Sequence, residues 1–380
     1  MICKIYWYKY IMKIWIVWLP NVGKSTLFNA LTKSYAADAA NFPFCTIEPN
    51  IWIVDVRDSR IDKLAQISNS QKIIYANVKF VDIAWLVKWA SQWEGLGNKF
   101  LANVREVDAI VQVLRYFADE NVLHVHDKVD PIYDSEIINT ELIISDMESV
   151  AKQLPSLVKI SKKTKEQEDI YDILLLCEKI LNQGKYIYDM IHDFAPEQLK
   201  ILKSLNLITS KPLIYAINVA ESDLNKFLDI ENDISSKLGS KKCIVLSAKL
   251  ESELQDMDDN ERIEYISDTV GNKFQDYSDY PTLDRLIKSA FDTVGLQYYF
   301  TTWEKETRAW TIPKWSTAPQ AAGAIHTDFE RWFIKAEIVK YDDLIAAGTW
   351  SKAKEAGKLW LQGKDYIMHD GDVVVFKFNV

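Results

Sequence analysis

A stretch near the start of the chain combines the residue types that bind the phosphates of a nucleotide. It reads Asn-Val-Gly-Lys-Ser-Thr over residues 21–26. Backbone N–H groups around Gly23 can cradle phosphate oxygens, the ammonium of Lys24 can reach the β- and γ-phosphates, and the hydroxyl of Ser25 can ligate Mg²⁺. The spacing predicts a phosphate-binding loop whose contacts to the nucleotide come from Asn21, Val22, Gly23, Lys24, Ser25 and Thr26.

Two elements are expected to hold this loop in place. Residues 13–18 form an apolar run typical of a buried strand, and residues 25–33 have a helical pattern. A helix that begins at the loop points its positive end at the bound anion. The loop departs from its motif at one position, because GxxxxGK[ST] begins with glycine and the chain has Trp18 there.

Two further stretches carry groups that can hold a metal ion. Residues 41–50 form a polar loop with two prolines, in which Thr46 can close over Mg²⁺ and the γ-phosphate. A plain connection between two elements is the alternative for this loop. An apolar strand from residue 78 ends in Asp82, an acid placed to hold Mg²⁺ directly or through water. The predicted metal site consists of Ser25, Thr46 and Asp82.

The apolar runs predict the fold class. Several of them do not alternate with polar residues and are separated by helical segments: residues 51–56, 109–114, 213–218 and 243–247. Strands of this kind are buried on both faces, which favours an α/β fold with a parallel-rich sheet between helices. Such sheets bind ligands at the carboxyl ends of their strands, where Asp82, Asn218 and Ser247 are located.

An insertion between two of these strands has a helical period. Residues 143–157 and 170–181 repeat apolar side chains every three or four positions, which predicts an antiparallel helical hairpin or short coiled coil, with a kink at Pro155. Its tip, residues 159–165, is the densest basic cluster of the chain. This tip is either a solvated connection or a contact to nucleic-acid phosphate.

The C-terminal region has the alternation of half-buried strands. Residues 308–313 and 333–340 alternate, residues 318–325 have the pattern of a short helix, and residues 366–380 are expected to hold two more strands. The pattern predicts a small mixed α+β module from about residue 297 to residue 380. We find no catalytic cluster in it, since His326 and Asp328 have no nucleophile beside them.

Composition limits the class of protein. At 380 residues the chain is long enough for two or three domains. A net charge of −9 argues against wholesale coating of nucleic acid, although a local basic patch remains compatible with it. The four cysteines have no CxxC or metal spacing and indicate thiols in a reducing cytosol. Residues 1–11 lack the pattern of a signal peptide, and we expect the native protein to start at Met12.

Six motifs together resemble those of the YchF or Obg-like ATPase family; they lie at residues 21–26, 41–50, 94–101, 129–131, 218–221 and 326–329. The resemblance covers residues 12–380. It implies three regions, namely a Ras-like P-loop NTPase domain, a helical coiled-coil hairpin inserted into it and a TGS-like β-grasp domain. Their expected boundaries are residues 12–132 with 206–296, residues 133–205, and residues 297–380.

The family binds ATP although its relatives are GTPases. The loop that reads the base is Asn-Val-Ala-Glu at residues 218–221, without the aspartate that accepts two hydrogen bonds from the edge of guanine. Loss of that aspartate removes the discrimination in favour of guanine. The resemblance therefore implies that the base is adenine and that the loops around it contribute Asn218, Val219, Glu221, Ser247 and Ala248.

The resemblance also implies the hydrolytic groups. Leu86 stands where Ras-type proteins carry the glutamine that orients the attacking water, so we expect slow intrinsic hydrolysis. By resemblance His124 takes that role, with Lys24 as the second catalytic residue. Asn21 resembles the asparagine through which relatives recruit K⁺ to the transition state. The expected cofactors are ATP, Mg²⁺ and K⁺.

The resemblance implies a cytoplasmic, monomeric ATPase switch that binds the ribosome, with no readout of DNA sequence and no contact with a membrane. Two alternatives remain open. One is a GTP-dependent ribosome assembly or translation factor. The other is a ribosome-binding module in which nucleotide binding is impaired.

Nine of the 13 tryptophans stand where the family pattern has glycine: Trp15, Trp18, Trp52, Trp85, Trp89, Trp93, Trp303, Trp315 and Trp332. The chain has 12 glycines, whereas an average chain of this length has about 27. Glycine at these positions provides positive φ or lets phosphate approach closely. Either a codon that means glycine in the source organism has been read as tryptophan, or the substitutions are real and the protein binds nucleotide poorly.

Overall fold

Six strands form the central sheet of the computed structural model, which describes residues 12–38, 51–82, 106–118, 129–158, 160, 164–254, 257–271, 274 and 279–379. Their order is β2 (Ile51–Val56), β4 (Ala76–Asp82), β1 (Met12–Trp18), β5 (Ala109–Arg115), β6 (Leu213–Asn218) and β7 (Cys243–Leu246). Neighbouring strands are parallel except for β2, which is antiparallel to β4. Every residue of β5 and β6 is buried, as their unalternated apolar runs require. The predicted α/β class is confirmed.

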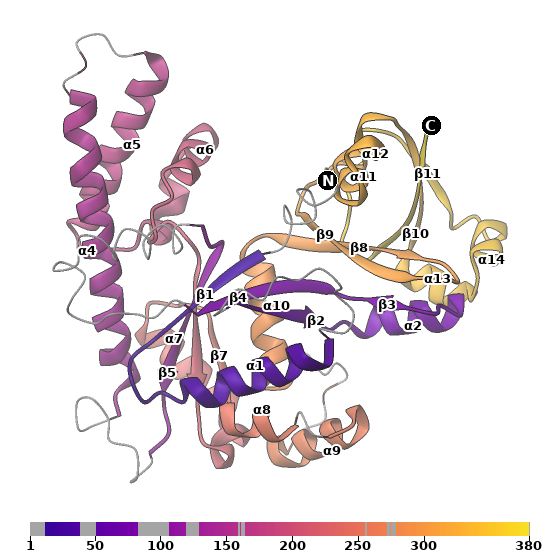
Figure 1. Ribbon diagram of the computed structural model, residues 1–380, viewed down its shortest axis with the longest axis horizontal. Coiled ribbons are helices and arrows are strands. Elements are labelled where there is room, and N and C mark those ends of the chain that lie inside the picture. Colours follow the sequence, from indigo (N-terminus) through magenta and orange to yellow (C-terminus); the bar gives the residue numbers. More distant parts are fainter. Residues whose placement is uncertain are drawn as a thin grey trace.

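Helices follow most of these strands (Figure 1). They are α1 (Lys24–Asp38), α2 (Ser59–Ser68), α7 (Phe227–Lys237), α8 (Ala248–Leu254), α9 (Asp259–Val270), α10 (Leu283–Thr293) and the short 3₁₀ helix η5 (Glu221–Lys226). The helix predicted at residues 25–33 is present as α1 and continues to Asp38. Because α1 starts directly after the phosphate loop, its N-terminus opens onto that loop.

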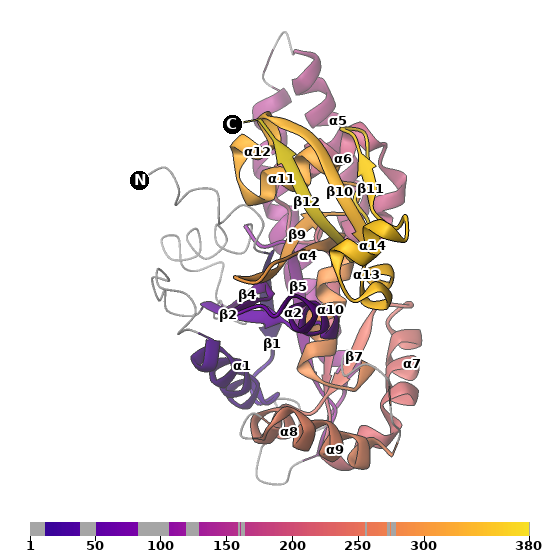
Figure 2. The same cartoon turned by 90° about the vertical axis from the view of Figure 1, so that its right-hand side faces the viewer.

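The predicted helical hairpin consists of α4 (Pro131–Val158) and α5 (Lys165–Leu181). It rises beyond the central sheet as an arm, which Figures 1 and 2 show from two sides. Leu142, Val150 and Leu174 are buried along the seam between its helices. Pro155 lies inside α4 and does not end it. The chain returns to β6 through η4 (Ile187–Asp193) and α6 (Pro196–Ser204).

A second sheet forms the C-terminal domain. Its order is β11 (Trp360–Gln362), β10 (Phe333–Lys340), β12 (Asp372–Phe378), β8 (Leu296–Thr302), β9 (Thr307–Pro313) and β3 (Ile73–Ile74). The accompanying helices are α11 (Ala318–Ile325), α12 (Thr327–Arg331), α13 (Tyr341–Ala347) and α14 (Trp350–Glu355). The predictions of strands at 308–313 and 333–340 and of a helix at 318–325 are confirmed.

The prediction of two strands within residues 366–380 was wrong, because only β12 lies there and β11 precedes it. The segment before β12 pairs with the chain only at an isolated bridge between Ile367 and Thr317, and it also forms local polar contacts. The carboxylate of Asp372 accepts hydrogen bonds from the backbone N–H of His369 (3.0 Å) and from the hydroxyl of Tyr366 (2.9 Å). Side-chain acceptors of this kind compete with strand pairing for backbone donors.

Residues 59–74 pack as part of the C-terminal domain, although the division by sequence assigns them to the nucleotide-binding domain. β3 pairs in parallel with β9, and α2 packs against β8 and β9. The hydroxyl of Ser70 donates a hydrogen bond to the carbonyl of Trp303 (2.6 Å), and that of Thr302 donates to Ser68 Oγ (2.7 Å). Strand pairing and hydroxyl contacts therefore join the two domains.

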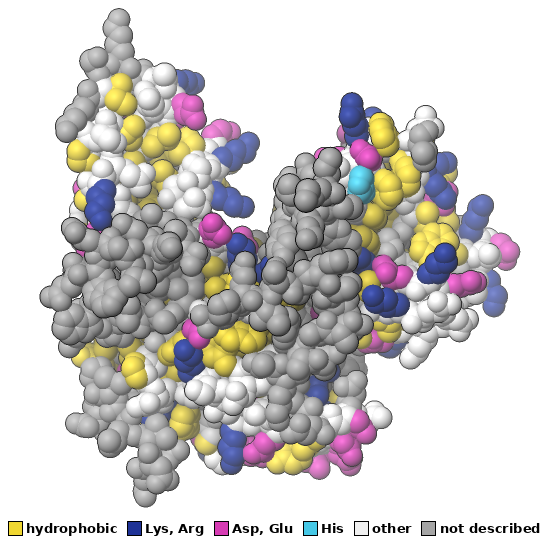
Figure 3. Space-filling model, viewed as in Figure 1, with side chains coloured by type: hydrophobic (Ala, Val, Ile, Leu, Met, Phe, Trp, Pro, Cys, Tyr) yellow, Lys and Arg dark blue, Asp and Glu magenta, His cyan; other side chains and the backbone are white. Residues whose placement is uncertain are grey.

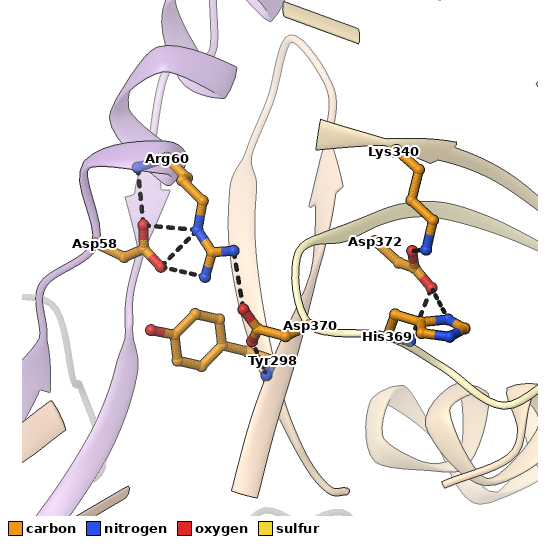
Figure 4. A network of polar contacts seen from close by, with 7 residues as sticks. All are labelled: Asp58, Arg60, Tyr298, Lys340, His369, Asp370 and Asp372. Atoms are coloured by element: carbon orange, nitrogen blue, oxygen red, sulfur yellow. Dashed lines mark hydrogen bonds and ion pairs between the residues drawn. The ribbon is translucent and has the colours of Figure 1, made fainter. Parts of the chain in front are cut away.

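An ion-pair cluster around Arg60 reinforces this joint (Figure 4). The Nη2 atom of Arg60 lies 2.8 Å from the Asp58 carboxylate, and Nη1 lies 2.9 Å from that of Asp370 on the C-terminal domain. The guanidinium also lies over the rings of Tyr298 (5.4 Å) and Phe300 (5.3 Å). Burial lowers the pKa of Arg60, but the two carboxylates outweigh burial and raise this pKa above its ordinary value. The cation is thus fixed in its charged form.

Candidate functional site

The phosphate loop connects β1 to α1 at the carboxyl edge of the central sheet. Asn21 (φ +67°) and Gly23 (φ +91°) both have the left-handed backbone conformation. A Cβ atom at Gly23 would lie 2.4 Å from Nδ2 of Asn218, so only glycine fits there. The backbone N–H of Leu27 donates to the carbonyl of Gly23 (3.0 Å) at the start of α1. The predicted loop therefore has a conformation that turns backbone N–H groups toward a bound anion.

Asn218, the last residue of β6, ties the phosphate loop to the loop after β7. Its Nδ2 donates to the carbonyl of Val22 (2.8 Å), and its Oδ1 accepts from the backbone N–H of Ala248 (3.0 Å). The side chain is almost fully buried. A primary amide has two N–H groups and two lone pairs on oxygen, so one of each is left for a base after these bonds. The Asn218 side chain therefore links the phosphate loop to the start of α8.

The other residues predicted to surround the base lie on both sides of Asn218. Val219 and Ser247 are buried beside it, and the backbone N–H of Val219 donates to Leu246 (3.0 Å). Glu221 begins η5, and its carboxylate accepts a hydrogen bond from the hydroxyl of Tyr265 on α9 (2.9 Å). This hydrogen bond raises the pKa of the Tyr265 hydroxyl. The carboxylate of Glu221 is therefore engaged by a neighbouring helix.

Lys24 and Asp82 meet beside the phosphate loop. The Nζ atom of Lys24 lies 2.9 Å from Oδ2 of Asp82, which ends β4. The other carboxylate oxygen of Asp82, Oδ1, is buried and accepts no hydrogen bond from any described residue. A buried carboxylate oxygen without a partner is costly unless a ligand satisfies it. Because Mg²⁺ takes oxygen ligands and often only one or two carboxylates, Asp82 fits the predicted metal site.

The indole of Trp18 lies against the same lysine. The Nζ atom of Lys24 is 4.4 Å from the centroid of the Trp18 ring and 5.5 Å from that of Phe28. Phe28 packs edge-on against Trp18, with centroids 5.2 Å apart, and contacts the ring of Trp52 at 4.4 Å. We call Trp18, Phe28 and Trp52 the aromatic cluster. A carboxylate and two aromatic rings therefore lie beside the Lys24 ammonium, the group predicted to contact the β- and γ-phosphates.

Sequence reasoning missed Arg115 at the end of β5. This arginine is almost fully buried, and its Nη1 donates to the carbonyl of Asn21 (3.2 Å) while its Nε donates to the carbonyl of Phe117 (3.0 Å). The guanidinium lies 4.6 Å from the ring centroid of Phe117. A basic residue at the carboxyl end of a buried strand was the available signal. Arg115 holds the carbonyl of the left-handed Asn21 in place.

Several predicted residues lie outside the part of the chain that the structure describes: Thr46, Leu86, His124, Trp85, Trp89, Trp93 and most of the basic tip. Six of the nine tryptophans predicted at glycine positions are described. Of these six, Trp315 alone has a positive φ (+70°). The need for a left-handed backbone therefore applies to Trp315. Of the other five, Trp15 and Trp18 are buried, whereas Trp303 and Trp332 are exposed.

Two family models match the chain. One, for the C-terminal part of YchF GTPases and described as a protein of unknown function, matches residues 296–379. The other, described as 50S ribosome-binding GTPase, matches residues 13–162. Within the described residues, the structure has no helix long and apolar enough to cross a membrane.

Curated proteins and a solved structure are similar over nearly the whole chain. Proteins named Ribosome-binding ATPase YchF from Bacillus subtilis and Haemophilus influenzae are each 45% identical, over 96% and 97% of this chain and 98% and 99% of theirs. The solved structure of the Schizosaccharomyces pombe YchF GTPase is 37% identical, has a TM-score of 0.82, and covers 97% of this chain and 98% of its own. The chain belongs to the YchF family.

Proposed function

We propose that the protein is a ribosome-associated switch that binds and hydrolyses ATP. The observation that carries the proposal is the arrangement of the phosphate loop, in which Gly23 is left-handed, Lys24 lies 2.9 Å from Asp82 and α1 begins at the loop. Relatives named as ribosome-binding ATPases support the choice of nucleotide and partner. ATP supplies the triphosphate that such a loop is built to hold.

Each residue of the site has a part in this reaction. Lys24 neutralises charge on the β- and γ-phosphates, and the backbone around Gly23 binds phosphate oxygens. Ser25, Thr46 and Asp82 would hold Mg²⁺, which when bound would neutralise the charge that develops on the phosphates. Asn21 would hold K⁺, which would add positive charge at the transition state. Arg115 and Asn218 keep the loop in shape through their bonds to the carbonyls of residues 21 and 22.

His124 positions the attacking water in this proposal. Leu86 cannot orient water, because its side chain has no hydrogen-bonding group, so intrinsic hydrolysis is slow. We expect replacement of His124 by alanine to reduce phosphate release while leaving the affinity for ATP nearly unchanged. An equal loss of affinity and rate would instead assign His124 to nucleotide binding.

The preference for ATP over GTP follows from residues 218–221. This segment has no aspartate for the guanine edge, and Glu221 is bonded to Tyr265. Isothermal titration with ATP and GTP tests the preference directly. Tighter binding of GTP would favour a GTP-dependent ribosome factor, the function that the description 50S ribosome-binding GTPase suggests.

A third function is favoured by one contact. Because the indole of Trp18 lies 4.4 Å from Nζ of Lys24, the protein with tryptophan at this position is a candidate for a ribosome-binding module with impaired nucleotide binding. Ribosome co-sedimentation that is the same with and without ATP, together with no phosphate release, would identify this module and exclude the switch.

The arm is the proposed ribosome contact. Binding of the γ-phosphate would order the loops around the site and change how the arm and the C-terminal domain are presented. We expect the triple variant K162E/K163E/K165E at the arm tip to bind ribosomes more weakly, with a smaller dependence on salt, because phosphate contacts release counterions. The variant K352E/K354E/K364E, which reverses three exposed lysines of the C-terminal domain, is the charge-matched control. Unchanged co-sedimentation of the triple variant would remove the arm from the interface.

A further inference from the structure

Lys24 has partners that compete with a nucleotide. We propose that an indole at position 18 competes with nucleotide phosphates for the ammonium of Lys24, so that the chain with Trp18 binds these phosphates more weakly than the same chain with glycine there. This inference rests on the proposed nucleotide binding. It assigns to position 18 an effect on the phosphate end of the ligand and none on the base.

The geometry of the lysine supports the assignment. Its ammonium lies 4.4 Å from the Trp18 ring centroid and 2.9 Å from Oδ2 of Asp82. A lysine cation over an indole face is the most favourable cation–π pair, and its strength increases when water is excluded. Only 9% of the Trp18 surface is exposed. The ammonium must therefore leave a partly desolvated contact before it can meet a phosphate.

The indole cannot easily move aside. Phe28 packs edge-on against the indole, with the ring planes at 72°. Trp52 in turn packs against Phe28. Phe28 belongs to α1 and Trp52 to β2, so the ring that packs against Trp18 is itself supported by a second element. Glycine, which the phosphate-loop motif has at this position, would remove the Trp18 ring and leave Asp82 and the more distant Phe28 ring beside Lys24.

The test compares the protein with Trp18, called the wild type here, with the variant W18G by isothermal titration of ATP in the presence of Mg²⁺. We expect W18G to bind ATP about tenfold more tightly, a factor that lies between the strengths of an exposed and of a desolvated cation–π contact. Adenosine, which has no phosphates, should bind both proteins equally. The matched control is W332G, since Trp332 is a half-exposed tryptophan of the C-terminal domain, and it should bind ATP as the wild type does.

A second pair of variants separates the lysine contact from a general effect on folding. In a K24A background, W18G should no longer change the affinity for ATP, because the proposed effect acts through the ammonium. W18A serves in place of W18G if glycine unfolds β1, and circular dichroism checks both. Equal ATP affinity of the wild type and a folded W18G or W18A overturns the inference while leaving ATP binding intact. If no folded variant binds ATP or GTP, the proposed function fails as well.

A different observation concerns Trp315, in the turn after β9. The backbone N–H of Ser316 donates to the carbonyl of Pro313 (3.2 Å), which closes a four-residue turn with Trp315 in third place at φ +70°. A positive φ in third place is a glycine position, since a side chain there is strained. The indole is 81% exposed and gains little packing in return. Tryptophan is therefore energetically unfavourable at this position of the turn, which favours glycine.

We infer that Trp315 and Trp18 are both specified by a codon that means glycine in the native cells. Two unrelated glycine positions carry the same replacement, and the whole chain has 13 tryptophans and only 12 glycines. A reassigned stop codon read with the wrong table would produce this pattern, since it converts one residue type into one other.

Peptide mass spectrometry on protein from the native cells tests this inference. Glycine at positions 18 and 315 supports it, and tryptophan at either position overturns it. The recombinant variant W315G gives an independent measurement. It should unfold at a temperature about 2 °C higher than the wild type, because the strain of a left-handed tryptophan is removed. A lower unfolding temperature would show that the indole stabilises the turn.

Discussion

The side chains around Lys24 and Arg60 are of the same chemical kinds, but the charged groups of the two sites differ in how many hydrogen bonds and ion pairs they form. Each cation lies near two aromatic rings and at least one carboxylate. Around the lysine these are Trp18, Phe28 and Asp82. Around the arginine they are Tyr298, Phe300, Asp58 and Asp370. The arginine has several bonds to two carboxylates from two domains. The lysine has one, and its carboxylate partner keeps a buried oxygen without a hydrogen bond from the described residues.

This difference separates a structural joint from a binding site. A planar guanidinium bonds several acceptors at fixed angles, whereas an ammonium on a flexible stem can change partners at low cost. The Arg60 cluster is satisfied by protein groups and needs no ligand. The Lys24 site leaves one carboxylate oxygen and one movable cation for a ligand of the opposite charges, a metal ion with phosphate.

The largest expected effect is on stability, from R60A. Removing the guanidinium leaves Asp58 and Asp370 close together without a cation, and we expect the free energy of unfolding to fall by about 3 kcal/mol. Urea denaturation measures this change. The control K237A breaks an exposed pair with Asp233 and should cost less than about 0.5 kcal/mol. If R60A is no less stable than K237A, the cluster is not a structural joint.

The second prediction concerns K24A, which should change function and leave stability nearly intact. We expect phosphate release to fall by about a hundredfold or more, because a charge aimed at the phosphates is lost. The free energy of unfolding should change by less than about 1 kcal/mol, since the Lys24 side chain is 36% exposed. K13A, which breaks an exposed pair between Lys13 near the start of β1 and Glu106, is the control. A large loss of stability in K24A would make both clusters structural.

The last prediction is a pH dependence from Glu251, a buried carboxyl that forms no ion pair with any residue in the described part of the chain. It accepts a hydrogen bond from the backbone N–H of Leu283 (2.8 Å), and burial raises its pKa from 4.5 to about 8. Between these values the folded protein keeps a proton that the unfolded chain has released. The free energy of unfolding therefore decreases as the pH rises, by at most about 1.4 kcal/mol per pH unit.

The variant E251Q tests this sign, because glutamine keeps the acceptor oxygen and cannot ionise. Urea denaturation at about pH 5 and about pH 8 should show a decrease in stability for the wild type and a smaller decrease for E251Q. The gain from E251Q should appear at the higher pH. A gain confined to the lower pH would mean that the folded protein prefers the ionised carboxylate.

Patterns local in the sequence determined a large part of the fold. The phosphate loop follows from six consecutive residues, because its cradle consists of neighbouring backbone N–H groups. The strands at 51–56, 213–218 and 333–340 and the helix at 318–325 follow from runs and alternation, and the structure has them with these bounds. Each pattern has a period that one element alone enforces, so no distant residue is needed to recognise it.

Only the tertiary structure decided which distant groups meet. Arg115 bonds Asn21, Asn218 bonds Val22, and Arg60 pairs with Asp370, which is far from it in the sequence. Residues 59–74 join the C-terminal sheet, although they lie between two strands of the nucleotide-binding domain. The sequence shows a tryptophan in place of glycine at position 18, but only packing puts its ring on Lys24. Contacts of this kind depend on how strands and helices pack in space, and sequence spacing carries no information about that distance.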